Sequence, residues 1–375
     1  MEIKWIKEYF SEVETEEEYD GYMYSIADAI TIVILGSVCG LKNVRQIRQW
    51  AASERVKEFL KENFAIERVP CYYWLLCLLK MVKPESLSQC FTDWVQSLVP
   101  ADKSGLTMSL DGKTIRSTAK MSNYENPLHI ISAQLTELGL TFGQRATEGK
   151  SNEIPAMQKL LEELELGGCM IVADAMHCQK ETAKIIIKQK ADYLLDVKDN
   201  QKTLKKDITD YVQDNTLRKG MDHVTIREKN RERVEIRTAY STTDISWLEN
   251  RPDWTGLRSI GAIHTEVKTA ESKTDTWHYY ISSRELTANE LLHHARMEWV
   301  VETMHWLLDV HFREDFFRAL DKNVQQNMNI LRKLSLNLIK KYKQTHSPKS
   351  ALSHIMFDAL LDPAFLLRIL EIREN

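Results

Sequence analysis

The segment from Leu106 to Val197 constrains the fold most, because its hydrophobic pattern changes repeatedly between strand spacing and helix spacing. Leu106 to Asp111 alternates between apolar and polar residues, and we expect Gly112 to turn the chain after it. Ile130 to Leu135 and Thr141 to Ala146 are two further short strand patterns with a turn signal between them. The segment therefore begins with three strands that hairpin connections can join.

The rest of this segment alternates between helix and strand. A helical pattern from about Glu153 to Leu166 leads to Cys169–Ala173, a continuous apolar run that is typical of a strand buried on both faces. A second helical pattern, from about Gln179 to Lys190, leads to the apolar strand Tyr193 to Val197. The complete order, β-β-β-α-β-α-β, predicts an α/β fold with a ribonuclease-H-like mixed sheet.

The regions on either side have different patterns. Residues 1–100 show helical spacing without a strand pattern, which predicts a small all-helical domain. We expect residues 101–345 to form the ribonuclease-H-like catalytic domain, with a β-rich insertion at about 221–283, and residues 346–375 to form a C-terminal helical tail. The helices expected in the first domain are Ile26 to Leu41 with Gly40 as its stop, Asn43 to Ala52, one that begins after Pro70, and one from near Pro84 towards Val99.

The charge of the chain argues against a uniformly basic protein. Its 50 Lys and Arg residues are outnumbered by 54 Asp and Glu residues, for a net charge of −4, whereas DNA binding favours a basic surface. Local basic clusters occur at 198–206 and at 332–349. Each cluster is either a solvated helix face or a surface that follows DNA.

Nothing at the N-terminus predicts a signal peptide, since Met1 to Tyr19 is acidic and lacks a long apolar core. The most apolar early stretch, Ile26 to Leu41, contains Asp28 and is too short to span a bilayer. The six cysteines are scattered without a C-x-x-C pair, which argues against disulfides and against a cysteine-ligated zinc site. We therefore expect a cytoplasmic protein with reduced thiols and no membrane partner.

Two aspartates stand where the predicted sheet would bring them together. Asp111 ends the first core strand, and Asp174 directly follows the first strand after a crossover. Neighbouring strands would place both carboxylates at one end of the sheet, where α/β sheets bind ligands. Two carboxylates held close together repel each other unless a cation lies between them. Oxygen ligands suit hard divalent cations such as Mg²⁺, and two such ions can support phosphoryl transfer.

A third carboxylate is expected from a helix. The stretch from Arg296 to Asp309 offers Glu298, Glu302 and Asp309, whose spacing places them on one helix face. Acids among tryptophans and leucines are unusual for a surface helix, whose polar face normally opposes the apolar one. Spacing alone leaves all three acids open as the third ligand.

Five sequence motifs in a fixed order make the prediction specific. They are LDGKTIR at 110–116, EGKSNEI at 148–154, ADAMHCQK at 173–180, VKDNQ at 197–201 and HWLLDV at 305–310. Together they resemble the H-repeat-associated family of bacterial insertion-sequence DDE transposases, over nearly the whole chain. The helical N-terminal region resembles the domain associated with that family, including the proline-containing turn Arg68-Val69-Pro70.

The resemblance implies a three-acid metal site. Asp111 and Asp174 fall on the family's two aspartates and Glu302 falls on its glutamate, with Asp309 as the reserve for the third acid. The implied cofactor is Mg²⁺ or Mn²⁺, as two ions. The residues expected near the active site or the DNA are Lys113, Arg116, Lys198, Asn200, Gln201, Arg296 and Trp299.

The implied reaction is metal-dependent cleavage of DNA at insertion-sequence ends, followed by strand transfer into target DNA. The implied partners are double-stranded DNA with terminal inverted repeats, target DNA, and a second copy of the chain in a DNA-bound homodimer. Such a bacterial protein would be cytoplasmic, and nucleoid-associated when bound to DNA. In-line phosphoryl transfer requires mainly positioning and charge neutralisation, so no covalent protein nucleophile is expected.

The chain departs from the family pattern close to Glu302. Glu298 stands where a histidine is usual, Thr303 where an asparagine is usual, and Asp199 where a glycine is usual. Glu298 also stands where the wider group has an arginine, and Arg296 is the residue expected to contact phosphate instead. Two alternatives follow: a catalytically inactive, domesticated DNA-binding protein, and a nuclease that cuts without strand transfer.

Several histidines and tryptophans near Glu302 have simpler interpretations than a second site. The histidines lack a zinc-binding spacing and are expected to face solvent or to be hydrogen-bonded; they are His293, His294, His305 and His311. Trp299 and Trp306 are expected in the core of the last helices. Stacking on an unpaired base at the DNA end is the alternative role.

Overall fold

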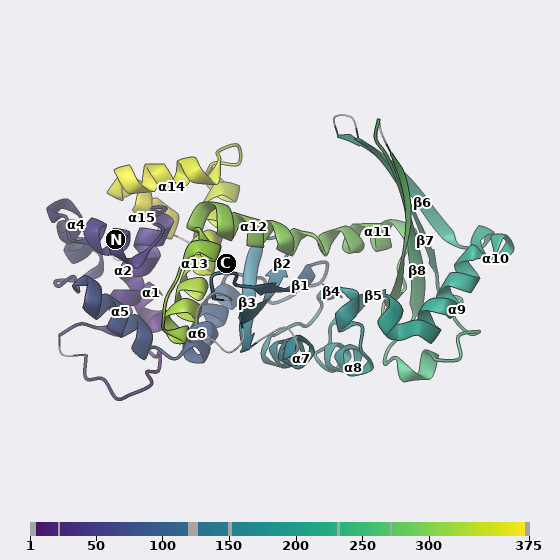
Figure 1. Ribbon diagram of the computed structural model, residues 1–375, viewed down its shortest axis with the longest axis horizontal. Coiled ribbons are helices and arrows are strands. Elements are labelled where there is room, and N and C mark those ends of the chain that lie inside the picture. Colours follow the sequence, from purple (N-terminus) through teal and green to yellow (C-terminus); the bar gives the residue numbers. More distant parts are fainter. Residues whose placement is uncertain are drawn as a thin grey trace.

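The computed structural model describes residues 5–21, 23–118, 127–148, 152–230, 233–270 and 272–371. The molecule is elongated, with a helical region at one end, a sheet in the middle and a region of long strands at the other end (Figure 1). Residues 149–151 of the second motif lie outside the described residues. Within the described ranges, no helix is both long enough and apolar enough to cross a membrane.

The N-terminal region is helical, as predicted. Its described helices are α1 (Trp5–Phe10), α2 (Ile26–Val38), α3 (Val44–Ala51), α4 (Glu54–Phe64), α5 (Tyr72–Met81) and α6 (Pro84–Ser97). The four expected helices are confirmed as α2, α3, α5 and α6. Gly40 follows α2 with a φ of 76°, and the Asn43 side chain caps α3 by accepting from the main-chain N–H of Gln46. The pattern does not mark α4 as a separate helix, because Lys, Arg and Glu fill much of it.

The core of the sheet has the strand order β3-β2-β1-β4-β5. These strands are β1 (Thr107–Thr114), β2 (Leu128–Leu135), β3 (Leu140–Glu148), β4 (Met170–Ala173) and β5 (Asp192–Val197). The first three are antiparallel neighbours, whereas β4 and β5 continue the sheet parallel to β1. This topology is that of a ribonuclease-H-like fold, so the predicted fold class is confirmed.

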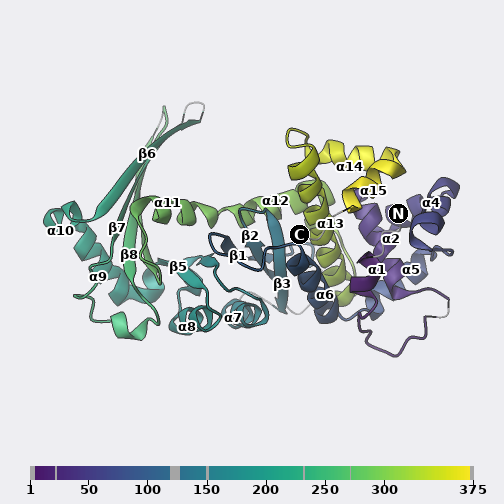
Figure 2. The ribbon, with the colours of Figure 1, turned by 180° about the vertical axis from the view of Figure 1, so that it is seen from behind.

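Helices cover both faces of this core sheet (Figures 1 and 2). One face carries α11 (Ala288–Met297) and α12 (Val300–Phe312), and the other carries α7 (Glu153–Glu163) and α8 (Lys180–Lys188). Along β4, Met170 and Val172 pack with α11, while Ile171 and Ala173 face the main hydrophobic core. The prediction of a strand buried on both faces is therefore confirmed for β4.

The β-rich insertion extends the core sheet rather than forming a separate one. Its strands are β6 (Asp222–Asn230), β7 (Arg233–Thr242), β8 (Ser259–Lys268) and β9 (Lys273–Ser282). They are antiparallel neighbours, and β9 also pairs with β5, from Leu194 with Ser282 to Val197 with Tyr279. One continuous sheet therefore runs from β3 to β6. The connecting elements are α9 (Lys202–Gln213), α10 (Asn215–Lys219) and the 3₁₀ turns η3 (Ala175–His177), η4 (Asp199–Gln201), η5 (Arg251–Asp253) and η6 (Glu314–Phe316).

Helix α13 (Lys322–His346) connects the helical region to the sheet. It packs against α2, α5 and α6 and also against β3. Its Asn337 side chain accepts from the main-chain N–H of Thr141 in β3 at 2.9 Å and donates to the carbonyl of the same residue at 2.8 Å. The last helices, α14 (Leu352–Leu361) and α15 (Pro363–Leu370), pack on α13. Helical region and sheet thus share one hydrophobic core, and the domain boundaries at residues 100 and 345 stay predictions.

Two residues of the basic cluster at 332–349 fit neither interpretation of its charge. Arg332 and Lys333 are only 1% exposed, so these two residues form neither a solvated face nor a DNA-following surface. The Lys333 ammonium donates to the Ser132 hydroxyl of β2 at 2.7 Å. The Arg332 guanidinium lies 4.5 Å from the ring centre of Phe317. Sequence spacing alone does not separate such buried cations from exposed ones, because both lie on the same helix.

Gly112 does not turn the chain, so that prediction is wrong. Strand β1 continues through Asp111 to Thr114, and Gly112 pairs with Ile131 of β2. A Cβ at this position would overlap with Nε2 of His129 and lie 2.5 Å from Oε1 of Glu153. A glycine is required here because two buried side chains approach the strand closely, and not because the chain reverses.

Those two side chains belong to a buried network beneath β1. His129 Nε2 lies 2.9 Å from Glu153 Oε2, and His177 Nε2 lies 3.3 Å from Glu153 Oε1. All three residues are at most 3% exposed. Burial disfavours the charged carboxylate, but the hydrogen bonds and charges of the two histidines outweigh it and lower the pKa of Glu153 to about 2. The network therefore fastens β2, α7 and the turn after β4 to one another.

Replacing Gly112 with alanine is expected to destabilise the protein by roughly 1–3 kcal/mol, the usual cost of overpacking, because His129 and Glu153 would have to move. Urea unfolding would measure this change. Gly167→Ala is the matched control, since nothing lies within 4 Å of a Cβ there. Equal stability of the two variants would contradict the close approach at Gly112.

Replacing Glu153 with glutamine is expected to lower the free energy of unfolding by roughly 2–4 kcal/mol at neutral pH, as a carboxyl pKa lowered to about 2 implies. The ionised carboxylate stabilises the fold above its unfolded pKa near 4.5, and this contribution disappears as the pH falls from there to about 2. The difference between wild type and variant should therefore shrink below pH 4.5 in urea titrations with EDTA present. The exposed Glu162 of the same helix provides the control Glu162→Gln. A difference that is independent of pH would contradict the prediction.

Candidate active site

Three neighbouring parallel strands present a row of aspartates, which lie within β1, directly after β4 and near the end of β5. Leu110 of β1, Ala173 of β4 and Leu195 of β5 are in register. The next residue after each of them is an aspartate, namely Asp111, Asp174 and Asp196. Because side chains alternate along a strand, all three aspartates belong to the face that α11 and α12 cover. The structure thus brings Asp111 and Asp174 to one edge of the sheet.

Asp196 is the member of this row that the sequence analysis does not identify. It is buried, and the Lys198 ammonium lies 2.8 Å from its Oδ2. Its Oδ1 and the Oδ1 of Asp174 are both buried, and neither has a hydrogen-bond partner among the described residues. The available sequence signal is a charged residue inside the otherwise apolar run Tyr193 to Val197, where burial normally excludes charge.

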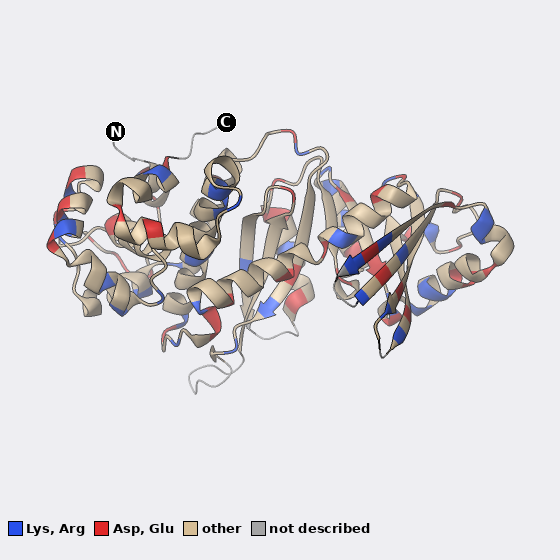
Figure 3. Ribbon diagram, turned by 90° about the horizontal axis from the view of Figure 1, so that it is seen from above, with Lys and Arg blue, Asp and Glu red and all other residues tan. Residues whose placement is uncertain are grey.

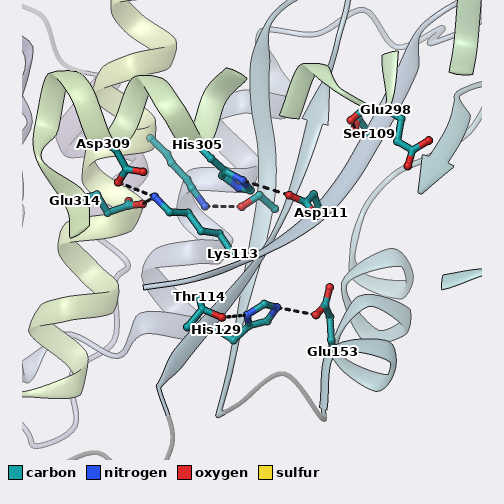
Figure 4. Close-up of polar contacts among 12 residues, drawn as sticks. Ser109, Asp111, Lys113, Thr114, His129, Glu153, Glu298, His305, Asp309 and Glu314 are labelled. Carbon is teal, nitrogen blue, oxygen red and sulfur yellow. Dashed lines mark hydrogen bonds and ion pairs between the residues drawn. The ribbon is translucent and has the colours of Figure 1, made fainter. Parts of the chain in front are cut away.

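Glu298 lies beside this row, and the charges of the row affect its pKa. Burial and then repulsion from Asp196 raise the pKa of Glu298 to about 8, with smaller contributions from the other two aspartates, while Lys198 acts in the opposite direction. The cluster therefore holds more negative charge than its one close lysine balances. Figure 4 shows Glu298 beside Ser109, which lies two positions before Asp111 on β1.

The predicted single helix face for the three acids is wrong, because the helix is interrupted between α11 and α12. The Ser109 hydroxyl donates to the main-chain carbonyl of Glu298 at 3.0 Å, which draws this carbonyl away from the helical hydrogen-bond ladder. As a result the acids have different surroundings. Glu298 lies near the aspartates, Glu302 is exposed in the first turn of α12, and Asp309 accepts a hydrogen bond from Lys113.

The two tryptophans of this region are not core residues, which corrects their prediction. Trp299 lies in the interruption and is 63% exposed, and Trp306 is similarly exposed on α12. The buried side of α12 is formed instead by residues such as Met304 and Leu308. Trp299 therefore offers an open indole face next to Glu298, as the stacking alternative requires.

His305 contacts the first aspartate of the row. Its Nδ1 lies 3.3 Å from Asp111 Oδ2, and the two side chains point toward each other in Figure 4. His294 is likewise partnered, since its Nδ1 lies 2.9 Å from the Thr107 hydroxyl. In the described part of the chain, no three His, Cys, Asp or Glu side chains lie close enough together to hold a metal ion. The prediction of partnered histidines is therefore confirmed for these two.

Lys113 lies in a second charged cluster, two residues along β1 from Asp111. Its ammonium donates to Asp309 at 2.7 Å and to the buried Glu314 at 2.9 Å (Figure 4). Burial lowers the pKa of Lys113, but the two carboxylates outweigh burial and raise it above its usual value. Lys113 therefore links β1 to the end of α12, and Asp309, the reserve acid, is already neutralised by it.

The other predicted DNA contacts have structural partners as well. Asn200 donates to the carbonyl of Ala175 at 2.6 Å and Gln201 donates to that of Cys178 at 2.9 Å, so both hold the turn that follows Asp174. Arg296 pairs with Glu228 of β6 at 2.9 Å. Arg116 is largely exposed, with its Nε 3.6 Å from Asp315. All of these residues stay predicted DNA contacts, and two of them also shape the acid row.

The donor set of the row fits a hard divalent cation. Asp111 and Asp174 follow paired residues of β1 and β4, and the buried Asp174 Oδ1 accepts no hydrogen bond among the described residues, with His177 Nε2 at 3.7 Å as its ion-pair partner. Burial first and then repulsion from Asp196 raise the pKa of Glu298 beside them. An oxygen-preferring ion such as Mg²⁺ would balance the charge of the aspartates and give the Asp174 Oδ1 a close partner.

Comparison with known proteins gives matches over most of the chain. Residues 97–338 match the family model described as Transposase DDE domain, and residues 7–95 match the one described as DDE_Tnp_1-associated. YhhI of Escherichia coli K12, whose name describes it as an H repeat-associated candidate transposase, is 30% identical over 99% of this chain and 98% of its own length. YncI of Escherichia coli O157:H7, also named as a candidate transposase, is 28% identical over 92% of this chain and 89% of its own.

A solved piggyBac transposase synaptic complex with hairpin DNA aligns with 100% of this chain and 79% of its own, at 10% identity and a TM-score of 0.39. The family assignment rests on the sequence matches alone. They extend over both the helical region and the sheet, and they include the segment that carries the aspartate row. The chain belongs to the DDE transposase family, together with the H repeat-associated proteins of Escherichia coli.

Proposed function

We propose that this protein cuts DNA at the ends of an insertion sequence and joins the freed 3′ hydroxyl ends to target DNA. Asp111 and Asp174 would hold Mg²⁺ or Mn²⁺, as two ions, with Glu302 as the third acid. The observation that carries the proposal is the register of β1 and β4, in which Asp111 and Asp174 directly follow the paired residues Leu110 and Ala173. Family membership supports the reaction class.

The chain's own residues would position the substrate and its charge. When bound, the metal ions supply Lewis-acid stabilisation of the attacking and leaving oxygens. His305 holds the Asp111 carboxylate in place, and the buried Glu153 network holds the turn that carries Asp174. Lys198 and Arg296 flank the row and would contact phosphate, while Trp299 would stack on an unpaired base. Such positioning is the main requirement of in-line phosphoryl transfer.

Glu302 as the third acid is supported by its place on α12. It lies one helical turn before His305, which reaches Asp111, so both residues project from the same side of the helix. Glu302 is exposed and therefore available to a metal or to DNA. Glu298 is the competing candidate, because it already lies within the electrostatic field of Asp111, Asp174 and Asp196. Asp309 is the weaker reserve because Lys113 neutralises it.

The proposed partners are double-stranded DNA with terminal inverted repeats, target DNA and a second copy of this chain. Pairing of two DNA ends requires a dimer in the DNA complex. A nuclease without strand transfer would use the same acid row. A domesticated DNA-binding protein would keep the fold but lack metal-dependent chemistry.

Asp174→Asn is expected to reduce cleavage by ~10²-fold or more, since even a displacement of about 1 Å in such a site has an effect of that size. The assay measures Mg²⁺- or Mn²⁺-dependent cutting of DNA that carries the sequences flanking the gene. Asp210→Asn, at an exposed position on α9, is the matched control and should cut like wild type. Specific binding by wild type without cutting would favour the domesticated protein, and cutting without joining would favour the nuclease.

The third acid can be identified by comparing two glutamines. Glu302→Gln is expected to lose cleavage to the same degree as Asp174→Asn, because it would remove a metal ligand. Glu298→Gln is expected to keep at least part of the activity near neutral pH, because a carboxyl with a pKa of about 8 is already mostly neutral there, as the amide is. The reverse pattern, with Glu302→Gln active and Glu298→Gln inactive, would transfer the role to Glu298.

A further inference from the structure

A groove of about 730 Å³ separates the helical region from the segment that follows α12. Its walls come from α3, from α5 and from residues 313–321. We call it the basic-aromatic groove, after its main lining residues, Arg45, Arg313, Arg318, Tyr72, Tyr73 and Phe316. Neither the acid row nor the proposed roles of its neighbours account for this groove.

The charge of the groove is strongly one-sided. Five cationic residues and a single acid, Asp321, line it, although the whole chain has a net charge of −4. Asp321 pairs with Lys80 at 3.6 Å. Arg45, Arg313 and Arg318 have no carboxylate within ion-pair distance among the described residues. Elsewhere acidic and basic segments intermingle over the molecule (Figure 3), so this local excess is not a general property of the surface.

The cations of the groove also crowd one another. Burial, followed by repulsion from Arg313 and Arg332, lowers the pKa of Lys42, which also lines the groove. An anion placed among these side chains would relieve the repulsion. The groove therefore fits a ligand that carries several negative charges.

Exposed aromatic rings complete the groove. Tyr73 is 71% exposed and Phe316 is 78% exposed, which is unusual for large rings unless they serve a binding surface. The Arg45 guanidinium lies 5.2 Å from the ring centre of Tyr72. Cations interleaved with exposed rings are the combination that binds nucleic acid, through phosphate contacts and through stacking or packing against bases and sugars.

The groove is physically joined to the acid row. Arg313 directly follows α12, and His305 of the same helix contacts Asp111. The next residues, Glu314 and Asp315, lie 2.9 Å and 3.8 Å from the ammonium of Lys113, which lies two positions after Asp111 in β1. The groove and the acid row are therefore linked through the end of α12 and through the ion pairs of Lys113.

We infer that the basic-aromatic groove binds the phosphate backbone of the DNA beside the cleaved position, with Tyr73 and Phe316 packed against its sugars or bases. This inference rests on the proposed function and assigns a second DNA contact to it. The groove thereby gives the helical region a direct part in holding the substrate.

The test measures DNA affinity separately from DNA cutting. The full chain carrying Asp174→Asn, which removes cutting, is titrated by fluorescence anisotropy against a labelled duplex with the sequences flanking the gene, over a series of NaCl concentrations. Combining Arg45→Gln, Arg313→Gln and Arg318→Gln should weaken binding at least ~10-fold. It should also reduce the slope of log affinity against log salt by about 2–3, because each phosphate neutralised by a cation contributes about 0.9 to that slope.

The charge-matched control for this variant combines Arg55→Gln, Lys61→Gln and Lys188→Gln. These three positions are exposed or half-buried and lie outside the groove. The control should leave both the affinity and the salt slope unchanged, although it removes the same number of positive charges from the chain.

A second variant tests how much the two exposed aromatic rings contribute to DNA affinity. Tyr73→Ala with Phe316→Ala should weaken binding while the salt slope stays constant, because no charge is removed. The control is Phe357→Ala with Leu361→Ala, two exposed apolar residues of α14.

Two outcomes would overturn the inference. One is wild-type affinity and salt slope in both groove variants. The other is a changed oligomer mass in light scattering with an unchanged salt slope, which would make the groove a contact between copies of the chain. In either case, metal-dependent cutting by the chain with Asp174 intact would still support the proposed function. Loss of that cutting while the groove still binds DNA would contradict the proposed role of the acid row and not this inference.

Discussion

One buried carboxylate, that of Glu153, lies between a histidine of the sheet and a histidine of the turn after β4 and joins them to α7. His129 comes from β2 and His177 from the turn directly after Asp174, so one side chain joins three segments that are distant in sequence. A charged group without water must be fully partnered to be stable, and this requirement makes the local geometry rigid. Gly112 is the consequence on the neighbouring strand, since any larger residue would occupy the space of the network. The turn that presents Asp174 is therefore supported from below by groups that never touch the substrate.

Above this support, the sheet brings several carboxylates close to one another. Asp111, Asp174 and Asp196 follow three residues in register, and Glu298 approaches from the covering helices. Folding brings these acids together against their mutual repulsion, with Lys198 as their close counterion. A cation beside such a cluster would reduce the repulsion among its carboxylates. The second cluster on β1 behaves differently, because Lys113 satisfies Asp309 and Glu314 within the protein.

Sequence patterns predicted the elements that depend on local periodicity. The alternation before Asp111 and the continuous apolar run before Asp174 were sufficient to place both aspartates at strand positions of a ribonuclease-H-like sheet. The patterns could not predict what depends on contacts between distant segments. Gly112 looked like a turn because its reason, the approach of Glu153, comes from another helix. The interruption at Glu298 depends on the Ser109 hydroxyl of β1, and the exposure of Trp299 follows from that interruption. Asp196 is recognisable in the sequence as a charged residue within an apolar strand. Its place beside Asp174 depends on the register of β4 and β5, which the sequence pattern does not give.

The pairing of β9 with β5 has a mechanical consequence. Because Asp196 pairs in register with Tyr280, the long strands of the insertion and the acid row share one hydrogen-bonded lattice. The insertion and Asp196 therefore belong to one sheet, and the insertion could not shift relative to the core without distorting the pairing of β5 with β9.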